Sequence, residues 1–392
     1  MDDSGFCALI ADLLERSHRV AAEELVGLVA EAARAMGLTG ADIYLADVQQ
    51  EHLVPLAGHG PALSVERTLA GLAYRSQNAQ IGNEPGTSLW LPLSDGIERI
   101  GVLHLEATGP VGQDLGQCRT LAGLVALLIV SKGSYSDTLQ QLVRSRPMRR
   151  QAELAWAFMP PRTIGTRAVT SSAVLEPAYE IGGDAFDHAL GETLHLTVVD
   201  AMGHDTASGL CAALAVAGCR AARRRGLGTS EIAAEVDQAL ARWVPDRLLT
   251  AVFAELDFRT GHFSWVNCGH PAPLLIRHQN VVAGALTRRA NLPLGLGPGY
   301  PAPDPALHQV QLEPGDRILV YTDGVTESRS EDGELFGEAR LVDTVIRATA
   351  AGQHASEALR RLIHAILGHR NGRLTDDATI LLAEWHPAPD QP

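Results

Sequence analysis

Aspartates stand beside short apolar runs at four places in this sequence. One follows two glycines, two come at or just after the ends of apolar runs at 196–199 and 319–321, and an adjacent pair precedes a run that begins at residue 378. A pair of glycines lets the backbone turn sharply and approach a ligand closely, because no Cβ intervenes. The aspartates are Asp184, Asp200, Asp323, Asp376 and Asp377.

A carboxylate at the end of an apolar strand is costly to bury unless a positive charge compensates it. At three of the four places, no Lys or Arg stands beside the aspartate. A single aspartate at a strand end is often only a turn residue, so none of them alone predicts a site. Together they predict a shared cation, and oxygen ligands without cysteine favour Mg²⁺ or Mn²⁺.

The acidic residues are concentrated in the same regions. The formal net charge is −14 over 392 residues. Seven acidic and no basic residues lie in 176–205, and eight acidic and two basic residues lie in 313–338. A protein that binds nucleic acid through phosphate contacts needs a clustered basic excess. The charge therefore predicts that nucleic acid is not a partner.

Other features predict a cytoplasmic protein without a membrane segment. The apolar run at 121–130 is shorter than the roughly 20 residues that span a bilayer. The acidic N-terminus lacks the pattern of a secretory signal. The five cysteines have no metal-type spacing, which is typical of reduced thiols in a reducing compartment.

Residues 161–386 predict one large α+β domain. Helices are expected at 207–225 and 230–244, between the second and third strands, and at 357–367, before the last strand. Strands in runs, with paired helices between them, favour two mostly antiparallel sheets packed between helices. The predicted strands are 168–175, 193–199, 250–257, 264–268, 274–277, 317–321 and 378–384.

Residues 1–135 predict a smaller α+β domain, whose order of elements resembles a GAF-type sensory domain. Two roles stay open for it: binding of a small-molecule ligand, and dimerisation or packing. Residues 136–160 predict one connecting helix, kinked at Pro147 and ended by two prolines, with an apolar stripe for a partner helix. The strands expected in the first domain are 43–45, 53–56, 88–93 and 100–105, and its closing helix is 118–130.

Six ordered motifs in residues 162–385 resemble the bacterial protein phosphatase 2C branch typified by the stage II sporulation protein E and the sigma-B regulatory phosphatases. This resemblance implies a metal-dependent phosphoserine/phosphothreonine phosphatase with two β-sheets stacked between helices. The motifs are Gly182-Gly183-Asp184-Ala185-Phe186-Asp187, Asp200-Ala201-Met202-Gly203-His204, Asn267-Cys268-Gly269-His270-Pro271, Leu292-Pro293-Leu294-Gly295-Leu296, Thr322-Asp323-Gly324-Val325 and Asp376-Asp377-Ala378-Thr379.

The resemblance also implies roles for individual residues. Asp200 would bridge two metal ions, with the Ala201 carbonyl as a further ligand. Asp323 and Asp376 would bind the first ion, and Asp184 would lie near the second, directly or through water. Two such ions hold phosphate oxygens and lower the pKa of a water that attacks phosphorus. Asp200 and Asp323 are thus the expected catalytic residues.

Four positions are less certain in the family pattern. Asp377 falls where relatives carry Asp or Asn, and we include it among the predicted metal residues. Asp205 replaces a common glycine, so it either adds a ligand for an extra metal or alters the turn. His204 and His270 are candidate proton donors to the leaving group, although we favour a structural role for His270 in a Gly-His-Pro turn.

The leading hypothesis is a cytoplasmic phosphatase that acts on a phosphorylated protein and is regulated by its N-terminal domain. The resemblance implies an anti-sigma-factor antagonist as substrate, and we hypothesise a homodimer that forms through the connecting helix. The connecting helix would act on the helices at 207–225 and 230–244, and so on Asp184 or Asp200. A non-catalytic signalling scaffold and a small-molecule phosphomonoesterase are the alternatives. A scaffold predicts loss of the acidic residues, and every one of them is present.

Overall fold

The computed structural model describes residues 1–82, 87–109, 115–296, 305–369, 374 and 376–386. The chain divides into two compact units, Met1–Pro147 and Met148–Pro392. The division falls inside the segment that was expected to form the connecting helix. Each unit is described by itself below.

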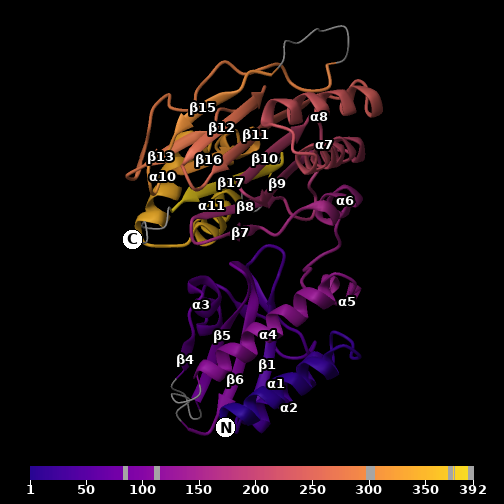
Figure 1. Ribbon diagram of the computed structural model, residues 1–392, viewed down its shortest axis with the longest axis vertical. Helices are drawn as coiled ribbons and strands as arrows, with labels where there is room; N and C mark the ends of the chain where they lie inside the picture. Colours follow the sequence, from indigo (N-terminus) through magenta and orange to yellow (C-terminus); the bar gives the residue numbers. More distant parts are fainter. Residues whose placement is uncertain (83–86, 110–114, 297–304, 370–373, 375, 387–392) are drawn as a thin grey trace. The chain divides into compact units, whose positions relative to one another are not determined.

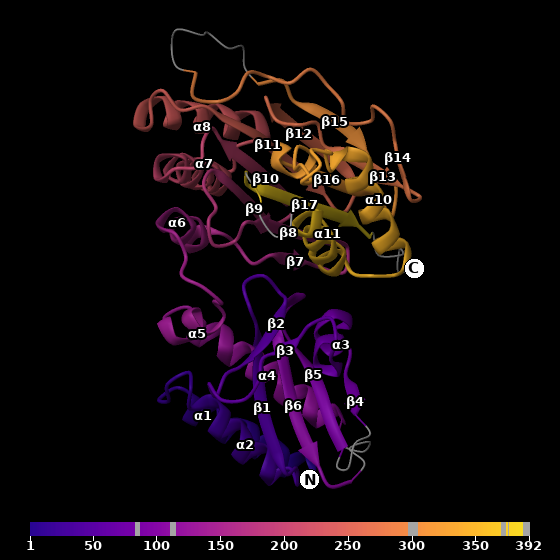
Figure 2. The ribbon, with the colours of Figure 1, turned by 180° about the vertical axis from the view of Figure 1, so that it is seen from behind.

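Unit 1 is an antiparallel sheet with helices on both faces (Figure 2). The strand order is β3-β2-β1-β6-β5-β4. The expected strands, the expected helix between the two strand pairs (α3) and the closing helix are present, whereas the short strands β3 and β4 were not anticipated. The elements are α1 (Asp3–Ser17), α2 (Leu25–Ala35), β1 (Gly40–Ala46), β2 (His52–Pro55), β3 (Leu63–Ser64), α3 (Leu69–Ser76), β4 (Gln80–Gly82), β5 (Thr87–Asp95), β6 (Glu98–Ala107), α4 (Leu115–Gly133) and α5 (Asp137–Leu142).

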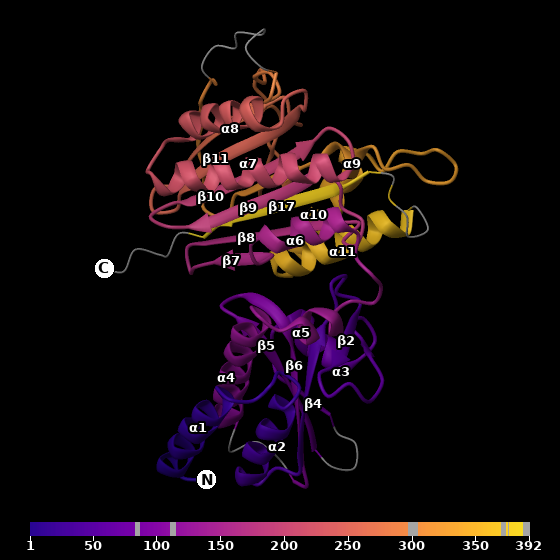
Figure 3. The same ribbon diagram turned by 90° about the vertical axis from the view of Figure 1, so that its right-hand side faces the viewer.

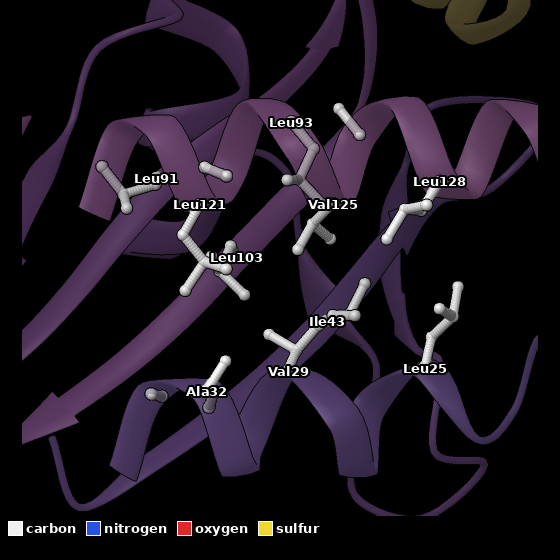
Figure 4. Packing of buried hydrophobic residues seen from close by; sticks show 14 of the residues in the cluster. Leu25, Val29, Ala32, Ile43, Leu91, Leu93, Leu103, Leu121, Val125 and Leu128 are labelled. Atoms are coloured by element: carbon white, nitrogen blue, oxygen red, sulfur yellow. The ribbon is translucent and has the colours of Figure 1, made fainter. Parts of the chain in front are cut away.

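The main core of unit 1 lies between the sheet and the helices α2 and α4 (Figure 4). Successive strand residues point to opposite faces, so Ile43 and Leu103 face this core while their neighbours Tyr44 and Val102 face α3. Among the described residues, α4 is the one helix that is long and apolar enough to cross a membrane by length and composition. Core helices of globular domains pass the same test, and Leu121 and Val125 of α4 are fully buried in this core.

The prediction of one connecting helix over 136–160 is wrong. Two short helices, α5 and α6 (Arg150–Phe158), are separated by a non-helical stretch that contains Pro147. Proline lacks the N–H that a helix interior needs. The two helices also belong to different cores, because Leu139 packs in unit 1, whereas Ala152 and Ala155 are buried in unit 2.

Unit 2 contains two sheets whose strands, over the described residues, pair antiparallel with their neighbours (Figure 1). Their strand orders are β15-β12-β11-β10-β9 and β14-β13-β16-β17-β8-β7. The elements after α6 are β7 (Thr163–Gly165), β8 (Val169–Glu176), β9 (Asp184–Leu190), β10 (Leu194–Ala201), α7 (Thr206–Arg224), α8 (Thr229–Trp243), β11 (Leu249–Asp257), β12 (His262–Cys268), β13 (Leu274–Arg277), β14 (Asn280–Val281), β15 (His308–Gln311), β16 (Arg317–Tyr321), α9 (Asp323–Thr326), α10 (Gly337–Ala350), α11 (Ala355–His369) and β17 (Ala378–Trp385).

The two sheets lie between two pairs of helices, as Figure 3 shows. Apolar side chains from both sheets, such as Phe186 and Leu381, form the layer between them. Alternate strand residues face outward, where α7 and α8 cover the first sheet and α10 and α11 cover the second. The expected α+β arrangement, two antiparallel sheets between helices, is confirmed.

A buried ion-pair cluster joins α7 to β9. Asp187 is 1 % exposed and accepts hydrogen bonds from Arg220 at 2.6 Å and from Arg223 at 2.9 Å. Arg220 also donates to the carbonyl of Phe158, at the end of α6. The second aspartate of the Gly-Gly-Asp-Ala-Phe-Asp motif therefore holds helices on the outer face of the sheet.

We predict that Asp187→Ala destabilises unit 2 by roughly 3 kcal/mol, because it leaves two arginines of a buried ion pair without their partner. Urea unfolding followed by tryptophan fluorescence measures this, since four of the five tryptophans are in unit 2. The control is Asp343→Ala, which removes the exposed pair with Arg347 in α10 and should cost less than about 1 kcal/mol. Equal effects of the two substitutions would contradict the prediction.

Candidate metal centre

Asp184 and Asp200 are directly opposite each other on the neighbouring antiparallel strands β9 and β10. Both side chains are on the face between the sheets, because they alternate with residues that face outward, Ala185 and Val199. Asp184 is 3 % exposed, and Asp200 is half-buried. The first sheet thus contributes two carboxylates to one end of the layer between the sheets.

The second sheet meets these carboxylates with two threonine hydroxyls. Thr322 follows β16 and donates to Asp184 Oδ2 at 2.8 Å, and Thr379 on β17 donates to the same oxygen at 2.6 Å. Both threonines are buried and face inward. Sequence reasoning missed them. The available signal was that each lies within two residues of a predicted ligand, at the strand position that faces the other sheet.

Asp323 and Asp376 complete the cluster from the same edge of the second sheet. Asp323 begins the short helix α9, directly after Thr322, and Asp376 lies two residues before β17. Both are exposed. The centre therefore has a buried floor and an exposed rim, through which a hydrated ion and a substrate can enter.

Within the part of the chain that the structure describes, the carboxylates of the centre have no basic counter-charge. Burial and the charges of Asp200 and Asp377 hold the pKa of Asp184 well above its usual range. Burial, together with Asp323, Asp376 and Asp377, raises the pKa of Asp200 to about 7. For both groups, every charge that shifts the pKa belongs to another carboxylate.

Asp377 is placed differently from the other four. It is 6 % exposed, and its Oδ2 accepts three backbone hydrogen bonds, from the N–H groups of Gly182, Gly183 and Asp184. Asp377 was predicted to bind metal, but these hydrogen bonds give its side chain a structural role.

Close backbone contacts explain two of the motif glycines. A side chain at Gly183 would collide with the carbonyl oxygen of Ala201, the predicted backbone ligand. A side chain at Gly324 would collide with the carbonyl oxygen of Asp377. Glycine is required where two backbone segments approach this closely.

Three further residues of the motifs do not join the cluster. Asp205 caps α7, accepting from Ser208 N and pairing with Arg247 at 3.1 Å, so of its two predicted roles the turn is the one seen. His270 is buried, its Nδ1 lies 2.8 Å from the Thr250 hydroxyl, and burial lowers its pKa to about 4. It is therefore uncharged at neutral pH, which supports the structural role over proton donation. His204 is exposed in the loop before α7.

The donor set fits hard divalent cations. It consists of carboxylate, hydroxyl and carbonyl oxygens, and the mutual repulsion of the carboxylates supplies a reason to bind positive charge. In the described part of the chain, no three His, Cys, Asp or Glu side chains are close enough together to enclose a metal ion by themselves. Mg²⁺ retains several waters and can be held by one or two carboxylates plus substrate phosphate.

Comparison with known proteins gives one family and several distant relatives. The family model described as "Stage II sporulation protein E (SpoIIE)" matches residues 191–386. The "Phosphoserine phosphatase RsbU" of Bacillus subtilis is 22% identical over 217 residues, which are 55% of this chain and 63% of that protein. "Protein IcfG" of Synechocystis is 28% identical over 136 residues, which are 35% of this chain and 20% of that protein.

A solved structure of the RsbU and RsbW domains of a Mycobacterium tuberculosis protein is also similar. It has 25% sequence identity and a TM-score of 0.45, and the match covers 56% of this chain and 62% of that one. The chain spans less than two thirds of each of these three relatives.

We predict that the metal-free protein loses stability as the pH rises from about 4 to above 7. The Asp200 carboxyl titrates near pH 4 when unfolded and at about 7 when folded. Between these values the folded state binds more protons, so the free energy of unfolding falls with rising pH. Asp200→Asn should flatten this slope and raise stability above pH 7.

Urea midpoints measured in a chelator from pH 5 to 8 test this, and a parallel series with Mn²⁺ should restore stability at high pH. Identical pH slopes for the wild type and Asp200→Asn would show that the Asp200 charge is not the destabilising group.

Proposed function

We propose that this chain, which belongs to the stage II sporulation protein E family, is a metal-dependent protein serine/threonine phosphatase. The observation that carries the proposal is the convergence of carboxylates from both sheets on one end of the sandwich, where no basic side chain within the described ranges pairs with them. A phosphatase site of this kind needs no nucleophilic side chain. Its reaction is the attack of water on phosphorus and the departure of the serine or threonine alkoxide.

Each of the four aspartates would have a separate role in binding the ions. Asp200 would bridge two ions, Asp323 and Asp376 would hold one of them at the rim, and Asp184 would face the other from the floor. Two Mg²⁺ or Mn²⁺ ions bound there would polarise the phosphate and make water a nucleophile at neutral pH. The exposure of Asp323 and Asp376 supports entry of the ions and of the phosphoryl group from this side.

Large apolar side chains beside the centre support a protein substrate. Met202, two residues after Asp200, is 56% exposed, and Leu210 on the first turns of α7 is 50% exposed. The Ser208 hydroxyl donates to the Met202 carbonyl and so joins the two segments. Exposed apolar groups at a rim are typical of protein contacts, and they favour a phosphoprotein over a small phosphomonoester. The name of the Bacillus relative, a phosphoserine phosphatase, supports the same class.

The finer parts of the function are proposals of the same kind. The substrate would be an anti-sigma-factor antagonist, in a cytoplasmic setting that suits five free thiols. A homodimer would form through unit 1, where Leu127 of α4 and Leu14 of α1 are 59% and 43% exposed. A small-molecule ligand of a GAF-like unit 1 stays the other prediction for that unit.

Regulation would pass through α6, which follows unit 1 directly in the sequence. The backbone N–H of Arg149 donates to Tyr179 O at 2.9 Å, and Trp156 Nε1 donates to Ala178 O at 2.8 Å. These acceptors lie shortly before Asp184 in the chain, and α6 also packs on α7. A displacement of α6 would thus move the segment that leads into the metal centre.

The activity itself is tested with metal-free protein supplied with Mn²⁺ or Mg²⁺, an aryl phosphate and a phosphoserine protein. We predict metal-dependent hydrolysis, and a loss of at least a hundredfold in kcat for Asp200→Asn and Asp323→Asn, because each removes a charge from the ion sites. The matched control is Asp205→Asn, which removes a nearby carboxylate but keeps an equally good helix cap and should retain activity. Turnover without metal, or turnover that survives both substitutions, would reject the proposal.

The route of regulation makes a separate prediction. Trp156→Phe removes one hydrogen bond from α6 to the segment before Asp184, worth about 1 kcal/mol. We expect the Mn²⁺ concentration for half-maximal rate to rise up to about fivefold, with kcat at saturating Mn²⁺ retained. The control is Trp243→Phe, an exposed tryptophan at the end of α8. An unchanged Mn²⁺ concentration for half-maximal rate in Trp156→Phe would show that α6 does not transmit regulation to the metal centre.

A further inference from the structure

Asp377 lies where the start of β17 meets the turn before β9. Its Oδ2 accepts from Gly182 N at 2.7 Å, from Gly183 N at 2.7 Å and from Asp184 N at 3.1 Å. Three successive N–H groups that converge on one point form an anion-binding concavity. In this protein an internal carboxylate, buried from solvent, occupies that concavity.

These bonds direct Asp377 away from metal coordination. Three donors occupy Oδ2 and leave at most Oδ1 for a cation, and the side chain is tied to backbone rather than to the open rim. Asp376, the preceding residue, is exposed at that rim. The two adjacent aspartates therefore have different surroundings, although the sequence motif presents them as equivalent.

The turn that Asp377 holds contains one proposed metal ligand, Asp184. It also contains the glycine that lies against a second one, the Ala201 carbonyl. Asp184 is the third residue of the turn and the register partner of Asp200. Gly183 lies against the Ala201 carbonyl, and its own carbonyl accepts from Ala201 N at 3.2 Å. A shift of the turn would therefore displace the Asp184 carboxylate and the Ala201 carbonyl together.

We propose that Asp377 is a positioning residue and not a metal ligand: it clamps the Gly182–Asp184 turn and so places Asp184 and the Ala201 carbonyl for metal binding. This inference rests on the proposed metal-dependent function. It differs from the role that the sequence motif suggests for Asp377, which is that of a metal ligand. Asp377 would instead influence metal binding through its three backbone hydrogen bonds.

The chemistry of the clamp predicts different results for two substitutions. Asp377→Ala removes the acceptor and leaves three N–H groups unsatisfied. Asp377→Asn keeps one acceptor oxygen but loses the charge, and hydrogen bonds to a charged acceptor are roughly twice as strong as neutral ones. The alanine variant should therefore be the weaker metal binder, and asparagine should restore part of the affinity.

The experiment measures Mn²⁺ binding to the full chain by titration calorimetry, without substrate, and the Mn²⁺ dependence of aryl phosphate hydrolysis. Removal of a residue that orients a ligand costs about 10- to 100-fold in metal affinity. We expect a weakening of that size in Asp377→Ala, a smaller one in Asp377→Asn, an unchanged number of bound ions, and a kcat at saturating Mn²⁺ within a few-fold of the wild type.

The matched control is Asp316→Asn. Asp316 is 1 % exposed and bonded to Arg277 and to the backbone N–H of Glu313, but it lies about 20 Å from Thr322 along β16. Asp316→Asn should lower the melting temperature without changing Mn²⁺ affinity. This control therefore distinguishes the loss of the Asp377 hydrogen bonds from a general loss of stability. If Asp377→Ala does not fold, the comparison of Mn²⁺ affinity between Asp377→Asn and the wild type tests the inference by itself.

The outcomes separate this inference from the proposed function. Loss of one bound ion in both Asp377 variants would make Asp377 a ligand and overturn the inference. Unchanged Mn²⁺ affinity in both, with a wild type that binds Mn²⁺, would overturn it while leaving the phosphatase intact. A wild type that binds no Mn²⁺ would overturn the proposed function first, and the positioning role with it.

Discussion

The repulsion among carboxylates at one end of the sandwich is the constraint on which the rest of unit 2 depends. Asp184 and Asp200 are brought together by strand pairing, and no basic side chain among the residues that the structure describes balances the negative charges around them. Neutral donors hold the most buried of them: two threonine hydroxyls bind Asp184, and three backbone N–H groups bind Asp377. Such donors orient a carboxylate without cancelling its charge, so that Asp184 can face a cation while Asp377 holds the turn before it.

The sandwich is what allows this arrangement. The inward positions of β10 and β17 are apolar along most of their length and change to Asp200 and Thr379 only at one end. The apolar layer supplies the burial free energy that offsets the repulsion at that end. Charged contacts elsewhere in unit 2 have another character, because Asp187 and Asp316 are each paired with arginine. These two carboxylates are thus paired with arginine, whereas the described residues form no such pair with the carboxylates of the metal centre.

The division of the chain has a similar physical basis. The segment around Pro147 cannot continue a helix, and the apolar residues on its two sides enter different cores. The helix α6 belongs to unit 2 and donates to the backbone that leads to Asp184. A regulatory input from unit 1 has this short segment as its covalent path, which is why the proposed regulation is assigned to α6 rather than to one long rigid helix.

The sequence by itself determined the two-sheet α+β class, most strands of both units and the list of acidic residues, because apolar periodicity and strand-end aspartates are local patterns. From the sequence, Asp376 and Asp377 were both predicted to be metal residues, and residues 136–160 were predicted to form one helix. Only the tertiary structure decided that Asp377 faces the Gly182–Asp184 backbone, that Asp205 caps α7, and that Thr322 and Thr379 reach Asp184. Those contacts join residues up to 195 positions apart, and local patterns carry no information on which distant segments pack together.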